Sequence, residues 1–224
     1  MCIRDSFMRV LVLCGDNAHP VSLTRDGLLG LRSGPFEFEF LEDPGDWSRS
    51  KMDDYPLIVF SKANQRTEED PEPWATEEIG KDFVDYVRQG NGLLVLHSGT
   101  ALYDECPSLC SLMGGVFAGH PAPCPVTVEP HVGHDLVIDS VGFTLLDEHY
   151  QMTMSDPDVD LFLEASSEHG VQPAGWTRRE GKGRVCVLVP GHFPNIWSHP
   201  SYQVLLRNTL NWCCLFYTSD AADE

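Results

Sequence analysis

Short apolar runs that stop at glycine or polar residues restrict the fold of this sequence more than any other feature. Runs of this kind suit strands that are buried on both faces of a sheet, and they occur at Met8–Cys14, Leu57–Phe60, Gly92–Leu96 and Arg184–Val189. The clearest helix is predicted between the second and third of them, at Thr76–Gln89, where Thr76 can cap the first turn. The alternation of strand, helix and strand predicts an α/β fold with a mostly parallel sheet and helices on both faces.

Further strands are predicted outside this pattern, at Phe36–Leu41, Val126–Glu129, Leu161–Glu164 and Gly175–Arg178. The first of them alternates Phe and Glu and is typical of an edge strand. The turn Glu180–Gly183 follows the last of them and predicts an antiparallel hairpin near the C-terminus. A final helix is predicted to begin at Pro200. No internal repeat or linker is visible, so we expect a single domain.

The composition and charge exclude several classes of protein. Of the 224 residues, 42% are hydrophobic, which is enough for a packed core and too many for a disordered chain. No apolar run approaches the ~20 residues that cross a bilayer, and the N-terminus lacks the layout of a secretory signal, so we expect a cytoplasmic protein. The net charge of -19 argues against nucleic acid or an anionic membrane as a partner.

The eight cysteines are not expected to form a disulfide framework. Cys106 and Cys110 are four residues apart on a predicted helix and therefore share one face of it. Metal binding by this pair remains an alternative, but core packing is favoured because no second Cys or His pair has the spacing of a zinc finger.

The two ends of the chain do not fit the pattern of strands and helices. Residues 1–6 (MCIRDS) and 214–224 (CLFYTSDAADE) look like translated sequencing-adapter sequence, of the kind found at the ends of metagenomic reading frames. We therefore expect the domain to comprise residues 8–213. The natural protein is expected to start at Met8 or to be truncated at either end.

Two histidines directly follow predicted strands. His97 comes after Gly92–Leu96, and His192 follows Pro190-Gly191 at the end of the last apolar run. In open α/β sheets, ligands bind in the crevice beyond the carboxyl ends of the strands. We therefore predict that both imidazoles share a pocket there, the alternative being that each bonds to a neighbouring loop. His19 follows the first strand and can reach the same crevice.

Two further segments carry side chains suited to acid–base chemistry. His120 leaves a glycine-rich turn in a direction that Pro121 fixes. The segment Asp147-Glu148-His149-Tyr150 places carboxylates beside an imidazole, where they can orient the ring, act as a general base or join it on a metal. The alternatives are a capped helix end with an exposed imidazole at His120 and a solvated acidic turn at 147–150.

Other candidates are weaker, and several known motifs are absent from the sequence. His131 and His134 lie in a loop and are expected on the surface, while Trp176 suits the core as well as a platform for stacking on a sugar. The sequence contains no Gly-rich phosphate loop and no G-x-S-x-G elbow. No cysteine follows a strand in the manner of an activated nucleophile.

Taken in order, these motifs resemble the ThuA-like (trehalose-utilisation) family. The motifs are Gly92–Gly99, Gly114-Gly115-x-Phe117-x-x-His120-Pro121, Asp147-Glu148-x-Tyr150, Trp176-x-Arg178, Gly181–Arg184 and Gly191-His192. The resemblance covers nearly all of residues 8–212. It implies a doubly wound, flavodoxin-like fold of the kind that class I glutamine amidotransferases have, and a link to the catabolism of trehalose or related sugars in bacteria.

The resemblance also bears on the chemistry of the site. Enzymes of the wider fold place a catalytic cysteine at a strand-to-helix elbow and a histidine after a later strand. Here the elbow position carries His97, followed by Ser98, and His192 stands at the later position. A histidine cannot form the thioester of glutamine hydrolysis, so we infer that amidotransferase activity is absent. Ser98 with His192 as its base remains an alternative nucleophile.

Two functions are compatible with these residues. The first is an isomerase, lyase or hydrolase of a sugar or keto-sugar, with catalytic residues His97, His120, Glu148 and His192 and substrate-binding residues Ser98, Asp147, Tyr150 and Trp176. In a variant of it, the four catalytic candidates hold a divalent metal such as zinc. The second is a non-catalytic carbohydrate-binding or accessory protein that uses the same pocket. The expected partner is a small carbohydrate, and a homo-oligomer is compatible with the sequence.

Overall fold

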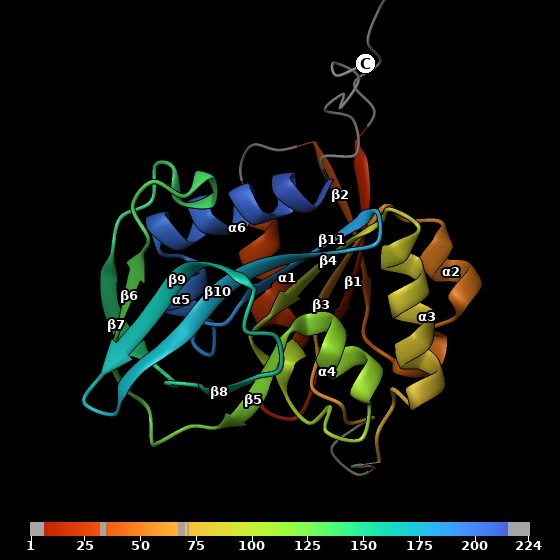
Figure 1. The fold of residues 1–224 in the computed structure, drawn as a ribbon, viewed down its shortest axis with the longest axis horizontal. Helices are drawn as coiled ribbons and strands as arrows, with labels where there is room; N and C mark the ends of the chain where they lie inside the picture. Colours follow the sequence, from red (N-terminus) through yellow and green to blue (C-terminus); the bar gives the residue numbers. More distant parts are fainter. Residues whose placement is uncertain (1–6, 32–34, 67–69, 71, 215–224) are drawn as a thin grey trace, which may run out of the picture.

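A nine-stranded mixed sheet runs through the centre of the protein, in a computed structural model that describes residues 7–31, 35–66, 70 and 72–214 (Figure 1). The strand order is β2-β1-β3-β4-β11-β10-β9-β6-β7. The five strands from β2 to β11 pair in parallel, and β11 to β7 pair antiparallel. The bounds are β1 Met8–Cys14, β2 Phe36–Leu41, β3 Leu57–Ser61, β4 Gly92–Leu96, β6 Cys124–Pro130, β7 Phe143–Asp147, β9 Asp160–Ser167, β10 Gly170–Glu180 and β11 Gly183–Leu188.

The sheet confirms the α/β prediction and corrects one part of it. The hairpin of β10 and β11 is antiparallel, as predicted from the turn at 180–183. The antiparallel part continues through β9, β6 and β7, so the sheet is mixed, with four parallel and four antiparallel pairings. A separate two-stranded ribbon, β5 Gly115–Gly119 with β8 Gln151–Met154, was not predicted. Its strands are short and only partly buried, and therefore carry little apolar signal.

Helices cover both faces of the sheet (Figure 1). Alternate side chains of a buried strand point to opposite faces, and in β1 Val10 and Val12 join one apolar cluster while Leu11 and Leu13 join the other. The first cluster includes residues of α1 Val21–Leu29, α5 Pro194–Trp197 and α6 Pro200–Cys214. The second includes residues of α2 Arg49–Asp53, α3 Glu77–Arg88 and α4 Pro107–Met113.

Local signals in the sequence explain where α3 and α6 begin. Thr76 caps α3 by accepting a hydrogen bond from the backbone N–H of Ile79, as predicted. Helix α6 begins at Pro200, also as predicted, and it ends at the buried Cys214, one residue beyond the expected limit of the domain. The proposed adapter residues 1–6 and 215–224 lie outside the described part of the chain.

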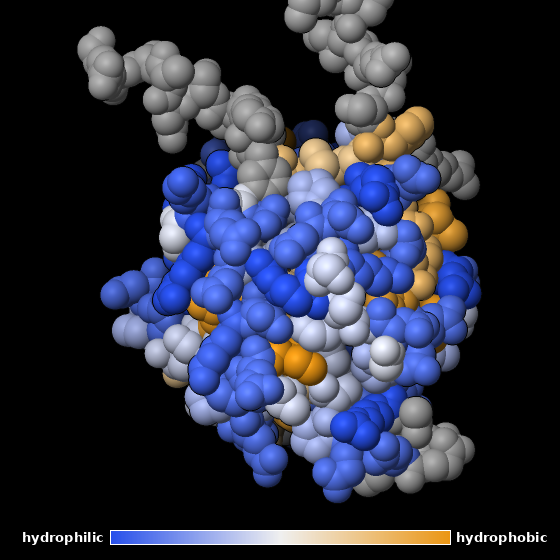
Figure 2. Space-filling model, turned by 90° about the vertical axis from the view of Figure 1, so that its right-hand side faces the viewer, coloured by the Kyte–Doolittle hydropathy of each residue, from blue (hydrophilic) through white to orange (hydrophobic). Residues whose placement is uncertain are grey.

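Hydrophilic residues predominate on the face shown in Figure 2, with smaller apolar areas between them. Within the described residues, no helix combines the length and apolar character needed to cross a membrane.

A tight turn directly after β4 positions His97. Residues His97–Thr100 form a 3-10 helix directly after β4. His97 has a φ of 41°, a left-handed conformation that is uncommon for any residue except glycine. Gly99 lies against β3 so closely that a Cβ atom would be 2.1 Å from the carbonyl oxygen of Phe60. The absence of a side chain at Gly99 therefore allows the turn to pack against the neighbouring strand.

We expect Gly99→Ala to lower the free energy of unfolding by about 2 kcal/mol or more, because the added methyl group must displace backbone atoms. Gly170→Ala is the matched control: its Cβ meets nothing within 4 Å, and its φ of 104° makes backbone strain the main cost. Chemical denaturation measures both variants. Equal stability of Gly99→Ala and the unmodified protein would contradict the close approach.

Candidate functional site

The candidate site is a carboxylate with three imidazoles around it, at the carboxyl edge of the parallel strands. One Glu148 oxygen, Oε2, lies 3.1 Å from Nδ1 of His192 and 3.8 Å from Nε2 of His97. The other oxygen, Oε1, lies 3.5 Å from Nε2 of His120. The structure therefore brings together all four residues that were predicted to be catalytic. They come from the ends of β4, β5, β7 and β11.

His97 is held rigidly with one ring nitrogen directed into this cluster. Its Nδ1 lies 2.8 Å from the carbonyl oxygen of Val189, and since a carbonyl can only accept, Nδ1 carries the proton. The ring stacks on Tyr150 at 4.2 Å between centroids. Burial lowers the pKa of His97 well below its ordinary value, and the neighbouring His19 adds to this effect. Nε2 of His97 is thus an unprotonated lone pair with no hydrogen-bond partner among the described residues.

His192 is positioned through its backbone by a buried acid. The Asp147 carboxylate accepts hydrogen bonds from the backbone N–H groups of Gly191 and His192, both at 3.0 Å. Burial raises the pKa of Asp147 to about 6, although both N–H groups favour its charged form. The same loop is fixed from the other side, since the indole N–H of Trp197 donates to the carbonyl of Gly191. Burial also lowers the pKa of the His192 ring, against the attraction of Glu148.

A fourth imidazole, His19, also reaches the cluster from the loop after β1. Its Nε2 lies 3.0 Å from Nδ1 of His192, and its Nδ1 lies 2.7 Å from Oδ1 of Asp16. Burial alone would raise the pKa of Asp16, but the hydrogen bond and charge of His19 and the N–H of Ala63 outweigh it and lower the pKa to about 2. Asp16 is therefore an ionised acceptor that orients the His19 ring. The sequence signal for His19 was its place after a strand.

Lys62 is a buried charged residue that the sequence analysis did not single out. It follows β3 directly, is 1% exposed, and donates from Nζ to the carbonyl oxygen of Gly15. Burial lowers the pKa of its ammonium group, while the charge of Asp16 opposes this shift. The same rule that identified His97, a polar residue directly after a buried strand, also applies to Lys62.

The predicted substrate-binding residues are buried. Ser98 is 1% exposed and its hydroxyl has no hydrogen-bond partner among the described residues, while Tyr150 is 4% exposed and stacks on the ring of His97. Asp147 is 1% exposed and uses its carboxylate on backbone N–H groups, so it cannot also take substrate hydroxyls. Trp176 is fully buried and donates its indole N–H to the carbonyl of Met113. Trp176 is therefore a core residue and not an exposed platform for a sugar.

The remaining histidines lie away from the cluster. His149 follows Glu148 but turns to the opposite side, where its ring nitrogens contact Ser167 and the carbonyl of Ala165. His134 pairs with the exposed Asp160, and His131 pairs with Glu164. The His131 side chain is 38% exposed and that of His134 is 19% exposed, so the expected surface position holds only in part.

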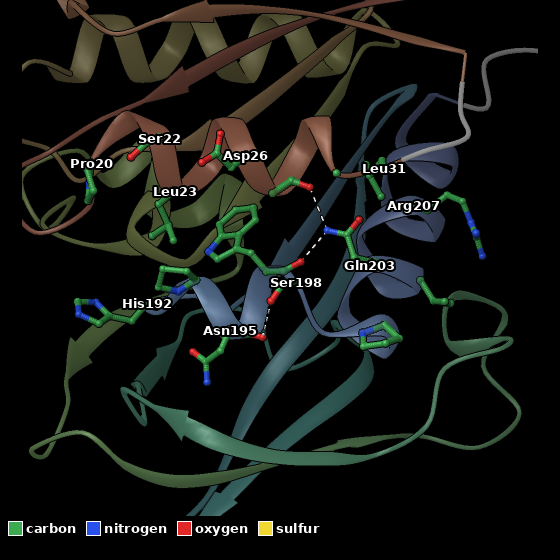
Figure 3. Close-up of a pocket in the computed structure, with 16 residues that line it drawn as sticks. Pro20, Ser22, Leu23, Asp26, Leu31, His192, Asn195, Ser198, Gln203 and Arg207 are labelled. Atoms are coloured by element: carbon green, nitrogen blue, oxygen red, sulfur yellow. Dashed lines mark hydrogen bonds between the residues drawn. The ribbon is translucent and has the colours of Figure 1, made fainter.

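A groove of about 1090 Å³ adjoins the cluster between α1, α5 and α6 (Figure 3). His192 stands at one end and Arg207 at the other. Polar side chains such as Ser22, Asp26 and Asn195 line it together with apolar ones. Of the four predicted catalytic residues only His192 lines this groove, so the groove and the histidine cluster are neighbours that share one residue.

This arrangement supports two kinds of chemistry. Imidazoles beside a carboxylate can transfer protons to and from a bound substrate. Separately, one nitrogen each of His19, His97 and His192 and a Glu148 oxygen all lie within 4.8 Å of one another, which is compact enough for a shared cation. His120 was predicted as a candidate metal ligand and His19 was not, whereas the compact group of donor atoms among the described residues contains His19 and not His120.

We expect Asp147→Ala to lower the free energy of unfolding by about 2 kcal/mol or more, since it leaves the N–H groups of Gly191 and His192 without an acceptor. Asp160→Ala serves as the control, because an exposed ion pair contributes ~0–1 kcal/mol. Thermal and chemical denaturation measure both. A loss no greater than that of the control would show that Asp147 does not fix the His192 loop.

Known proteins resemble this chain in sequence and in fold. The family model for trehalose utilisation, ThuA, matches residues 9–213. A search of curated proteins finds no match. A crystal structure described as a ThuA-like protein, from Bacteroides uniformis, is 19% identical with a TM-score of 0.74, and the match covers 95% of this chain and 94% of that one. A similar protein from Parabacteroides merdae is 18% identical with a TM-score of 0.72, covering 93% and 90%.

Two further structures extend the likeness in fold. A protein described as cytoplasmic, from Salmonella typhimurium, is 14% identical with a TM-score of 0.66, and the match covers 92% of this chain and 99% of that one. A β-galactosidase from Bacillus circulans is 11% identical with a TM-score of 0.63, and the match covers 92% of this chain but 31% of the enzyme. At these identities the similarity concerns the fold. The family match, which spans almost the whole chain, is the stronger finding: this protein belongs to the ThuA, or trehalose utilisation, family.

Proposed function

We propose that this protein is an enzyme of sugar catabolism that acts on a sugar or keto-sugar by proton transfer, and that it is not an amidotransferase. The observation that carries the proposal is the contact of three imidazoles, those of His97, His120 and His192, with the single carboxylate of Glu148. General acid–base groups of these types suit proton abstraction next to a carbonyl, as in an isomerase, lyase or hydrolase of a keto-sugar.

Exposure distinguishes the roles of these groups. The His120 side chain is 32% exposed and can exchange protons with a substrate and with solvent. The side chains of His97 and Glu148 are 2% and 11% exposed, so they form the inner part of the site. His192 is intermediate, at 18%, and joins the inner part to the groove. We therefore assign proton exchange with the substrate to His120.

The adjoining groove supports a carbohydrate as the substrate class. Hydroxyl, carboxylate and amide side chains along it can pair with sugar hydroxyls, and its apolar lining can cover the faces of the rings. Membership of the trehalose utilisation family agrees with this choice.

We also infer a flavodoxin-like winding of the chain from the order of the parallel strands. We infer a cytoplasmic location as well, since the Salmonella proteins of similar fold are described as cytoplasmic.

A non-catalytic carbohydrate-binding protein is the other candidate, but the geometry favours it less. Such a protein would offer aromatic faces to a sugar, and the two aromatic residues that were predicted to bind substrate are both covered. Trp176 is fully buried, and Tyr150 packs between His97 and Phe117.

Turnover of sugars in D₂O tests the proposal. We expect the full chain to convert at least one member of a panel of aldoses, disaccharides and keto-sugars, with deuterium entering next to the carbonyl. His120→Ala should reduce the rate by ~10²–10⁴-fold, the usual contribution of a general acid or base. Nuclear magnetic resonance follows both the products and the isotope.

His134→Ala is the matched control, because this histidine pairs with an acid on the surface, and its rate should equal that of the unmodified protein. Binding of a panel sugar without turnover would support the non-catalytic alternative. An equal rate in His120→Ala would show that this imidazole does not transfer the proton.

A further inference from the structure

We propose that His19, His97, His192 and Glu148 bind one divalent cation of the zinc class. The catalytic meaning of such an ion rests on the proposed function, but its binding can be measured without any turnover. The positions of the protons on the imidazole rings support such an ion.

When the rings are neutral, which is the form in which imidazole binds a metal, the nitrogen atoms that face one another carry too few protons to hydrogen-bond with each other. The outer nitrogen of His97 donates to the Val189 carbonyl, and that of His19 donates to the Asp16 carboxylate. In the neutral rings both inner nitrogens are therefore lone pairs. They meet a third nitrogen, Nδ1 of His192, and the Glu148 carboxylate. With His19 and His97 neutral, one N–H at most, that of His192, lies among these acceptors, and the remaining lone pairs are available to a cation.

His97 provides a second, independent observation. Its side chain is 2% exposed, and its inner nitrogen has no hydrogen-bond partner among the described residues. A buried nitrogen left without a partner is destabilising unless something binds it. A metal ion on this nitrogen would remove that destabilisation. His120 differs, because its side chain is 32% exposed and can take a proton from solvent.

The distances suit an ion of small radius. Ligands at ~2.0–2.1 Å from a tetrahedral zinc ion are ~3.3 Å from one another. In the cluster, His192 Nδ1 lies 3.0 Å from His19 Nε2 and 3.1 Å from Glu148 Oε2, and His97 Nε2 lies 3.8 Å from that oxygen. All four donor atoms lie within 4.8 Å of one another. Small side-chain movements would bring them onto a common centre.

The chemistry of the donors selects the kind of metal. Three imidazoles and one carboxylate favour zinc and similar first-row ions, whereas magnesium and calcium prefer oxygen ligands. Metal-bound histidines commonly donate their other N–H to a carboxylate or a carbonyl, which fixes the tautomer. Asp16 and the Val189 carbonyl already have these roles toward His19 and His97.

Isothermal titration calorimetry, in which Zn²⁺ is added to the chelator-treated full chain, tests this inference. We expect one site per chain, and a loss of affinity of about 100-fold or more in His97→Ala and in Glu148→Gln. Asp16→Asn keeps the ligands but weakens the orientation of His19, so its affinity should fall by ~10–100-fold. Co²⁺ added instead should give visible bands of a nitrogen and oxygen site, without thiolate charge-transfer bands.

His134→Ala is the control, and it should bind Zn²⁺ as the unmodified chain does, because this histidine pairs with Asp160 away from the cluster. Circular dichroism checks folding, and the nearly isosteric Glu148→Gln decides the matter if His97→Ala does not fold. The inference is overturned if the unmodified chain does not bind Zn²⁺, if Glu148→Gln binds it equally well, or if cobalt shows thiolate bands. Zinc binding without sugar turnover would contradict the proposed function alone, whereas turnover without zinc affinity would contradict this inference alone.

Discussion

The site depends on the in-register parallel pairing of the central strands. Cys14 of β1 pairs with Ser61 of β3, and Leu96 of β4 pairs with Leu188 of β11, so these strands end at one edge of the sheet. The residues that follow the strands must then come together, whatever their separation in sequence. His19 and His192 are 173 positions apart and yet lie in hydrogen-bond contact. The antiparallel half of the sheet contributes the carboxylate, since β7 ends next to Glu148.

Two buried acids hold the imidazoles in different ways. Asp16 accepts a hydrogen bond from the ring of His19 and so determines which nitrogen faces inward. Asp147 accepts hydrogen bonds from backbone N–H groups and so determines where the His192 loop lies, without contact to the ring. His97 is held by a backbone carbonyl and by the unusual φ of its own turn. Such fixed orientations are what a metal or a proton-transfer site requires.

Much of this could be predicted from the sequence, because strand and site share one signal. An apolar run followed by a polar residue marks both a buried strand and a side chain at its carboxyl end. This signal predicted that His97 and His192 lie close together, and their ring centroids are 5.7 Å apart. His19 was also predicted to reach this crevice, whereas Lys62 was not singled out although it directly follows the buried strand β3. The order of the antiparallel strands, and the burial of Asp147 and Trp176, depend on contacts between distant segments that periodicity does not report.

The central claim is that imidazoles from separate strand ends and Glu148 share one centre. X-ray absorption at the zinc edge, recorded on the zinc-loaded full chain, tests it most directly. The account predicts nitrogen and oxygen neighbours at ~2.0–2.1 Å with the outer-shell scattering of several imidazoles. A shell of sulfur at ~2.3 Å, or a spectrum without imidazole scattering, would show that the ion binds elsewhere and would contradict the account.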